Sequence, residues 1–155
     1  MMRLDRADRA LMSALQENAR QTNVELAAHV GLSPSACLRR VNLLEDNGVI
    51  SGYHAMIDAE KIDYAVTVLV QITLTGQSAV ILGEFEKAVV RIPNLLACFL
   101  MAGAKDYILR IAARDVEDYG QIHSDHLSAL PHVQSMESNF VLRTVINRGL
   151  PVDLL

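Results

Sequence analysis

The spacing of the apolar residues changes near Gly48, and this change limits the possible folds more than any other feature of the sequence. Before Gly48 apolar residues recur at every third or fourth position, which is the period of a helix. After Gly48 the period changes to two, and strand-like segments then alternate with helical ones. The sequence therefore predicts an α+β chain with a helical N-terminal part and a mixed C-terminal part.

Length and composition exclude several classes of protein. The chain has 155 residues, of which 51% are hydrophobic and 21% charged, so we expect one or two globular domains. Its longest apolar run, Leu95–Ala104, has ten residues, whereas a membrane helix needs about 20. The charged N-terminus lacks the apolar core of a secretory signal. With only Cys37 and Cys98, neither a disulfide framework nor a zinc site is expected, and a cytoplasmic location without membrane contact is the default.

Capping residues predict three short helices in the N-terminal part. The first begins near Asp5, and the second begins at Thr22, which forms a capping box with a Glu three residues later. Gly31 ends the second helix, and Ser33 before a proline starts the third, which is expected to run to about residue 47. The short turn between the second and third helices predicts a helix-turn-helix. The alternating residues 50–58 are expected to form a hairpin or wing.

The third helix is amphipathic and has a polar face suited to DNA. Its apolar face carries Cys37, Val41 and Leu44, so these should be core residues, while Leu43 should be exposed. The opposite face carries side chains that can bond base edges, and Arg40 lies on its flank. Because the net charge is −4, any DNA contact must be local. The candidate contacts to double-stranded DNA are Thr22, Ser33, Ser35, Arg39, Arg40 and Asn42.

The C-terminal part has the order β-α-β-β-α-β, which predicts a ferredoxin-like, four-stranded antiparallel sheet with both helices on one face. The other face would be too apolar for water and predicts a partner sheet. We expect domains at residues 1–58 and 66–155 with a linker at 59–65. The expected strands are Val66–Thr75, Leu95–Met101, Tyr107–Ala113 and Val133–Ile146, the helices Ser78–Arg91 and Val116–Leu130, and the uncovered apolar residues Leu69, Leu96, Cys98, Leu100 and Ile108.

Several motifs resemble one known family. The segments Leu32–Val41 and Leu44–Tyr53 closely resemble the Lrp/AsnC ("feast/famine") family of prokaryotic transcription regulators. The loop Gly103–Tyr107 matches the G-x-x-D-Y motif of that family, and the resemblance covers essentially the whole chain. Family members often carry basic residues where this chain has Asn42 and Leu43, so fewer phosphate contacts are expected from this helix.

The resemblance implies a fold and partners. The fold is a winged helix-turn-helix domain followed by a ferredoxin-like ligand-sensing domain. The partners are a second copy in a homodimer formed through facing sheets, commonly assembled to an octamer, and a small-molecule effector, an amino acid or a related metabolite. The residues implied in effector binding are Gly103, Ala104, Lys105, Asp106 and Tyr107.

Three alternatives remain open at this stage. His123 and His126, followed by His132, could supply metal ligands, although a helical wheel places the first two toward the packed face. An enzyme on the same fold is a second possibility, but no nucleophile with an adjacent base indicates one. A DNA-binding protein that organises the nucleoid without any effector is the third. We assign no catalytic residue, metal or cofactor.

Overall fold

The computed structural model describes residues 3–152, which form two compact units. One unit comprises residues 1–56 and 146–155, and the other comprises residues 57–145. The C-terminal residues 146–152 therefore belong with the N-terminal unit, whereas the sequence placed all of 66–155 in the second domain. Val152 explains this difference, because its side chain is buried in the same apolar cluster as Leu11.

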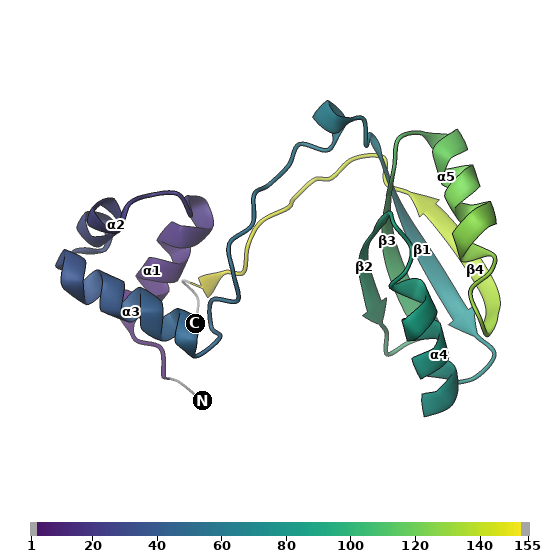
Figure 1. The fold of residues 1–155 in the computed structure, drawn as a ribbon, viewed down its shortest axis with the longest axis horizontal. Coiled ribbons are helices and arrows are strands. Elements are labelled where there is room, and N and C mark those ends of the chain that lie inside the picture. The colour runs from purple at the N-terminus through teal and green to yellow at the C-terminus, as the bar shows by residue number, and fades with distance from the viewer. Residues whose placement is uncertain (1–2, 153–155) are drawn as a thin grey trace. The chain divides into compact units, whose positions relative to one another are not determined.

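The N-terminal unit contains α1 (Arg6–Glu17), α2 (Asn23–Val30) and α3 (Pro34–Asp46) (Figure 1). Each helix begins where capping predicted. Asp5 and Asp8 form a capping box at α1, Thr22 forms one at α2, and the Ser33 hydroxyl accepts a hydrogen bond from a backbone N–H in the first turn of α3. Gly31 ends α2 with φ at 70°, a conformation that favours glycine.

The helical core confirms the predicted apolar face of α3. Cys37 and Leu44 are fully buried and pack with Leu11 of α1 and Leu26 of α2. Burying each such side chain stabilises the folded state by about 1.5–3 kcal/mol. Because this face of α3 is buried, the opposite face, which carries the predicted DNA contacts, is the one that stays exposed.

The predicted hairpin at residues 50–58 is not formed, because residues 51–58 adopt no strand in this structure. Alternating residues make a stable strand only when another segment pairs with their N–H and C=O groups, and these residues are exposed throughout. A single 3₁₀ turn, η1 (Glu60–Ile62), follows within the expected linker.

The second unit contains β1 (Val66–Leu74), α4 (Ala79–Val89), β2 (Leu95–Leu100), β3 (Tyr107–Ala113), α5 (Val116–Ile122) and β4 (Val133–Phe140). The strand order is β2-β3-β1-β4 and all neighbours are antiparallel, which confirms the ferredoxin-like arrangement. A π-helical turn, η2 (His123–Leu127), completes the second predicted helix.

The core of this unit lies between the sheet and the two helices, which cover one face (Figure 1). Val68, Val70 and Ile72 of β1 are fully buried, and the rings of Phe85 and Tyr107 lie 4.5 Å apart between their centroids. The expected final strand is too long: β4 ends at Phe140, which pairs with Val68 of β1, and among the described residues beyond it only the Val141 N–H bonds to β1, at Thr67 O.

A bulge in β2 changes which residues lie on the uncovered face. The pairing shifts between Leu95 and Ala97, so one residue is added to β2 and the alternation after it is inverted. Cys98 then pairs with Leu109 and packs against the core, so the prediction for Cys98 was wrong. Leu100 pairs with Tyr107, on the side of β3 that the helices cover, but at the end of β2 it is still 58% exposed. Phe99, paired with Ile108, lies on the uncovered face instead.

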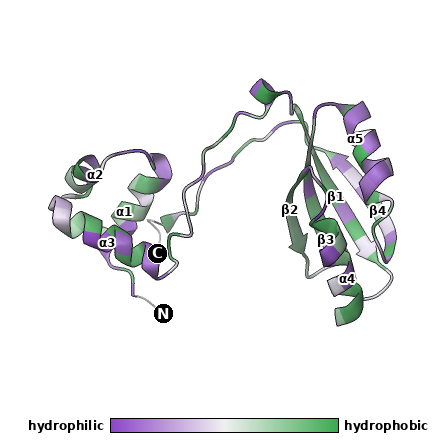
Figure 2. Ribbon diagram, in the orientation of Figure 1, coloured by the Kyte–Doolittle hydropathy of each residue, from purple (hydrophilic) through white to green (hydrophobic). Residues whose placement is uncertain are grey.

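The uncovered face remains partly apolar beyond this correction. Leu96 and Phe99 are 54% and 56% exposed. Half-buried Ile108 of β3 pairs with Phe99, and half-buried Leu69 of β1 pairs with Arg110 of β3. Figure 2 shows that β2 is hydrophobic along its length, whereas α5 is largely hydrophilic. The sheet therefore has an apolar strip at its β2 side that nothing in this unit covers.

Candidate DNA interface and effector site

The exposed face of α3 carries three of the predicted DNA-contacting residues. Ser35, Arg39 and Asn42 are exposed, directly opposite buried Cys37 and Leu44. Among residues 3–152 the structure records no ion pair or hydrogen bond for the Arg39 guanidinium. A free guanidinium on an exposed helix face can make a bidentate contact to guanine or bind a phosphate.

Two leucines border this face. Leu38 and Leu43 are 51% and 46% exposed, so the predicted exposure of Leu43 is confirmed. Packing within the unit does not explain either side chain, whereas apolar side chains in a major groove can contact thymine methyl groups.

Arg40 is engaged within the protein. Its Nη1 lies 2.6 Å from Asp8 Oδ1 and 2.8 Å from Asp5 Oδ2, and the Asp8 side chain is only 4% exposed. Both carboxylates raise the pKa of Arg40, Asp8 most, so the group stays charged. The expected free phosphate contact of Arg40 is therefore not supported: this residue joins α3 to the start of α1.

Thr22 and Ser33 serve as helix caps in this structure. The Thr22 hydroxyl and backbone N–H both donate to the Glu25 carboxylate, at 2.8 and 2.7 Å. These bonds lower the pKa of Glu25, so the cap persists in mild acid. The sequence did not single out Asn23, whose Nδ2 donates to Pro34 O at 2.8 Å and joins the start of α2 to the start of α3.

One contact anchors the segment that follows α3. The Tyr53 hydroxyl donates to Glu45 Oε1 at 2.7 Å. Burial, followed by the Glu45 carboxylate, raises the pKa of Tyr53 to about 12, so the phenol stays protonated and keeps donating. This hydrogen bond holds the segment that leaves the helix-turn-helix to α3, between residues eight positions apart in the chain.

In the loop predicted to bind the effector, Gly103–Tyr107, the Asp106 carboxylate is buried, and each of its two oxygens accepts a hydrogen bond from within the protein. The residue is 6% exposed, its Oδ2 accepts from the Leu74 N–H at 2.7 Å, and its Oδ1 accepts from Gln77 Nε2 at 2.7 Å. Its backbone N–H donates to Ile72 O at 2.9 Å. In this conformation Asp106 holds the loop to β1, and it is not available to bind the ammonium group of a ligand.

Tyr107 is also a core residue. It is 1% exposed, and its hydroxyl donates to Glu86 Oε1 at 2.7 Å. Burial, followed by the Glu86 carboxylate, raises the pKa of Tyr107 well above its ordinary value. The expected direct contact of Tyr107 with an effector is therefore not supported, because the ring faces α4 across the core.

The remaining loop residues are accessible. Gly103 and Ala104 are exposed, and a Cβ at Gly103 would meet no atom within 4 Å. Lys105 is half-buried, with its Nζ 3.6 Å from the Glu137 carboxylate of β4. Of the five predicted effector residues, these three remain open to a ligand.

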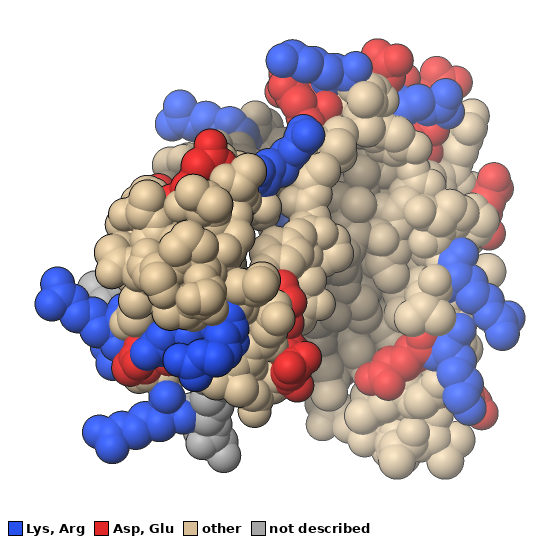
Figure 3. Space-filling view, turned by 60° about the vertical axis from the view of Figure 1, so that its left-hand side comes forward, with Lys and Arg blue, Asp and Glu red and all other residues tan. Residues whose placement is uncertain are grey.

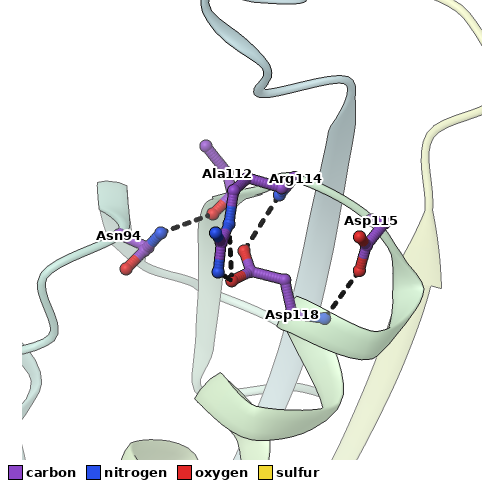
Figure 4. A network of polar contacts seen from close by, with 5 residues as sticks. All are labelled: Asn94, Ala112, Arg114, Asp115 and Asp118. Atoms are coloured by element: carbon purple, nitrogen blue, oxygen red, sulfur yellow. Dashed lines mark hydrogen bonds and ion pairs between the residues drawn. The ribbon is translucent and has the colours of Figure 1, made fainter.

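The opposite end of β3 is fixed by a separate polar network (Figure 4). Asn94 Nδ2 donates to Ala112 O at 3.1 Å, which joins the start of β2 to β3. Arg114 donates through Nε and Nη2 to Asp118 Oδ1, and Asp115 caps α5. Hydrogen bonds from Arg114 lower the pKa of Asp118. This end of the sheet is thereby held in place independently of the effector loop.

The three histidines considered as metal ligands are exposed or half-buried. His123 and His126 are exposed, which differs from the packed face expected for them, and His132 Nε2 lies 2.5 Å from the Glu84 carboxylate. Across residues 3–152 no group of three metal-ligating side chains comes together. Within the same residues, no helix has both the length and the apolar character that a membrane crossing requires.

Figure 3 shows that charge is unevenly spread on the N-terminal unit. In this view Lys and Arg side chains gather near its lower edge, with acidic groups beside them, while its broad centre is uncharged. This distribution agrees with a local nucleic-acid contact, since a general basic coat would cover the unit.

Comparison with known proteins accounts for both units. Residues 4–51 match the family model described as winged helix-turn-helix DNA-binding, and residues 67–151 match the Lrp/AsnC ligand binding domain. The Bkd operon transcriptional regulator of Pseudomonas aeruginosa is 36% identical, over 97% of this chain and 99% of its own. The leucine-responsive regulatory protein of Escherichia coli is 36% identical, over 92% of this chain and 87% of its own.

A solved structure agrees with these matches over the full length. A transcriptional regulator from Neisseria meningitidis in complex with L-Met has a TM-score of 0.92 and 34% identity, covering 99% of this chain and 100% of that one. The sequence matches and the structural match thus agree for both units. The chain belongs to the Lrp/AsnC family of transcription regulators.

Proposed function

We propose that the protein reads double-stranded DNA through Ser35, Arg39 and Asn42 and responds to an amino acid or a related metabolite. The observation that carries the DNA assignment is the exposed face of α3, with an Arg39 guanidinium that binds nothing among the described residues. Because DNA is the target, we place the protein in the cytoplasm.

In this proposal Arg39 contacts one base, and the neighbouring side chains on α3 contact the bases next to it. Arg39 reaches guanine O6 and N7, while Ser35 and Asn42 bond adjacent base edges. Thr22 and Ser33 keep the helix starts rigid, and the free backbone N–H groups of those first turns face phosphates. One such helix reads few bases, so specificity requires two copies.

The DNA assignment is tested by Arg39→Ala. We expect a loss of about 1–3 kcal/mol on a duplex selected from a random library, with relaxed specificity and an unchanged fold. Arg91→Ala is the matched control, because Arg91 is also exposed but lies after α4 in the other unit. Salt-titrated binding to selected and unselected duplexes measures both effects. If Arg39→Ala binds the selected duplex like the wild type, α3 is not the reading helix.

For the effector we propose the exposed part of the loop, Gly103 to Lys105. Backbone N–H groups there can donate to a carboxylate, and Lys105 can meet an acidic ligand group. L-Met in the related Neisseria structure supports an amino acid as the ligand class. Asp106 keeps the loop in place through β1, so its contribution is indirect.

Gly103→Val isolates ligand contact from folding. The new side chain has open space, and no positive φ demands glycine at this position, so the fold should be unchanged. A thermal-shift screen of the amino acids, followed by calorimetry with the best ligand, should show weaker binding by the variant. Gly83→Ala, also in open space but within α4, is the control. Wild-type affinity in Gly103→Val would place the pocket elsewhere, and a screen without any ligand would favour the effector-independent, nucleoid-organising alternative.

We further propose a homodimer formed through the uncovered sheet face, assembling to an octamer. A dimer places two recognition helices about 34 Å apart, which is one turn of DNA. Phe99→Asp should break the dimer, since an unpaired charge is costly to bury, whereas Val80→Asp on exposed α4 should not. Light scattering measures the mass of each. A soluble Phe99→Asp protein with the wild-type mass would contradict this interface.

A further inference from the structure

A second candidate ligand site lies within the DNA-binding unit, in a groove between α1 and α2. The groove encloses about 360 Å³ and is lined by side chains from these two helices only, with none from α3. That volume falls in the range of about 300–1,000 Å³ that holds small molecules. The groove is therefore distinct from the reading face of α3 and from the effector loop.

The charge of this groove is predominantly positive. Arg6 and Arg9 are three residues apart on one face of α1, and His29 of α2 lies beside them, while Glu17 is the one acidic side chain in the lining. Residues at this spacing on a helix are neighbours, so the two guanidinium groups can converge on one ligand. The structure records no ion pair among residues 3–152 for either arginine.

One atom in the groove lacks a partner. Arg9 Nε is buried, and among the described residues no acceptor lies within hydrogen-bonding distance. A buried donor without an acceptor costs free energy, and a charged one costs more. Because this atom has almost no exposed surface, an oxyanion in the groove would reach Arg9 through its other guanidinium nitrogens.

We propose that this groove binds a small organic oxyanion. Its carboxylate or phosphate group is bound by Arg6, Arg9 and His29, because guanidinium groups match the geometry of oxyanions. Ala10, Ala14 and Val30 form the apolar part of the lining, which suits a short carbon skeleton. The negative charge of Glu17 repels the oxyanion and so lowers the affinity of the groove for it.

The proposal is tested by calorimetry on the full chain with glutarate and with glycerol phosphate, which separate the two sources of an oxyanion. We expect saturable binding of one of them, with one site per chain. Arg9→Met keeps the aliphatic stem and removes the donors, and it should weaken binding about tenfold or more. Glu17→Gln should strengthen binding, because it removes a repelling charge from an exposed position.

Arg20→Gln is the matched control. Arg20 is exposed, belongs to the same unit and lies outside the groove, so this change alters the net charge equally and should leave affinity within about twofold. If Arg9→Met loses its fold by circular dichroism, Arg6→Gln, at an exposed position, decides instead.

Three results would overturn the site. The first is no saturable binding of either ligand. The second is an equal loss in Arg20→Gln, which would mean diffuse attraction. The third is Arg9→Met keeping the wild-type affinity for the ligand while lowering the salt slope of DNA binding by about one, which would mean that a DNA phosphate occupies the groove.

Discussion

Replacing Arg40 by alanine separates a structural role from a DNA contact. Arg40 is on the recognition helix, so a basic side chain there would ordinarily be assigned to phosphate. In this structure it bonds Asp5 and Asp8 at the start of α1 instead. We expect Arg40→Ala to lower the stability of the N-terminal unit and to weaken DNA binding only as a consequence.

The size of the effect follows from the burial of Asp8. Its carboxylate is 4% exposed and accepts from Arg40 at 2.6 Å. Leaving a buried charge without its partner costs about 3–5 kcal/mol. Arg40 itself is 27% exposed, so water screens part of this loss and we expect about 2–3 kcal/mol. For a unit of this size that corresponds to a fall in Tm of about 8–24 °C.

Asp8→Asn gives the discriminating result, because the two roles predict opposite signs. If Arg40 bound a DNA phosphate, Asp8→Asn would release the Arg40 guanidinium from its ion pair and tighten DNA binding. If Arg40 joins the helices, Asp8→Asn destabilises the unit as Arg40→Ala does. Thermal melts with salt-titrated DNA binding measure both, and Arg39→Ala, with the same charge change one residue away, should leave Tm unchanged. An unchanged Tm in Arg40→Ala, with a salt slope lower by about one, would refute this reasoning.

Three further outcomes follow from buried or paired groups. Asp106→Ala should lower the free energy of unfolding of the second unit by about 1–3 kcal/mol, because the Leu74 N–H of β1 loses its acceptor. An unchanged thermal melt would contradict this. Burial raises the pKa of both cysteine thiols, but only Cys37 has no exposed surface, so native alkylation at neutral pH should modify half-buried Cys98 first. Arg114 lowers the pKa of Asp118, so this carboxylate stabilises the fold above its ordinary pKa and loses that effect as pH falls; Asp118→Asn should flatten the acid side of the stability profile.

The features that could be predicted from sequence are set by neighbouring residues. A capping box joins residues three apart, and the two faces of α3 follow from a period of 3.6, so Thr22, Ser33, Cys37 and Arg39 were placed correctly from local spacing. The order of strands and helices is likewise visible in the alternation of the C-terminal part. These features require no knowledge of which distant segments meet.

The features that were missed depend on distant partners. The Asp8 to Arg40 and Leu74 to Asp106 contacts each join residues 32 positions apart. Both turned expected ligand contacts into structural ones. The bulge in β2 likewise depends on pairing with β3, and periodicity within Leu95–Leu100 carries no sign of it. Sequence therefore predicted the candidate surfaces, whereas the structure shows which side chains on them are free of partners within the described residues.

The return of the chain end to the N-terminal unit gives the two units a second covalent connection. Two stretches connect the units, one entering β1 and one leaving β4, and they leave the sheet as neighbours, because the Val141 N–H donates to Thr67 O at 2.9 Å. At its other end β1 is held to the effector loop by Asp106. An effector changes DNA affinity only if it binds one state more tightly than another. A ligand that displaced the loop would move β1, and with it both connections. Substitutions at Gly103 should therefore alter ligand affinity, whereas substitutions at Asp106 should alter the coupling between ligand and DNA.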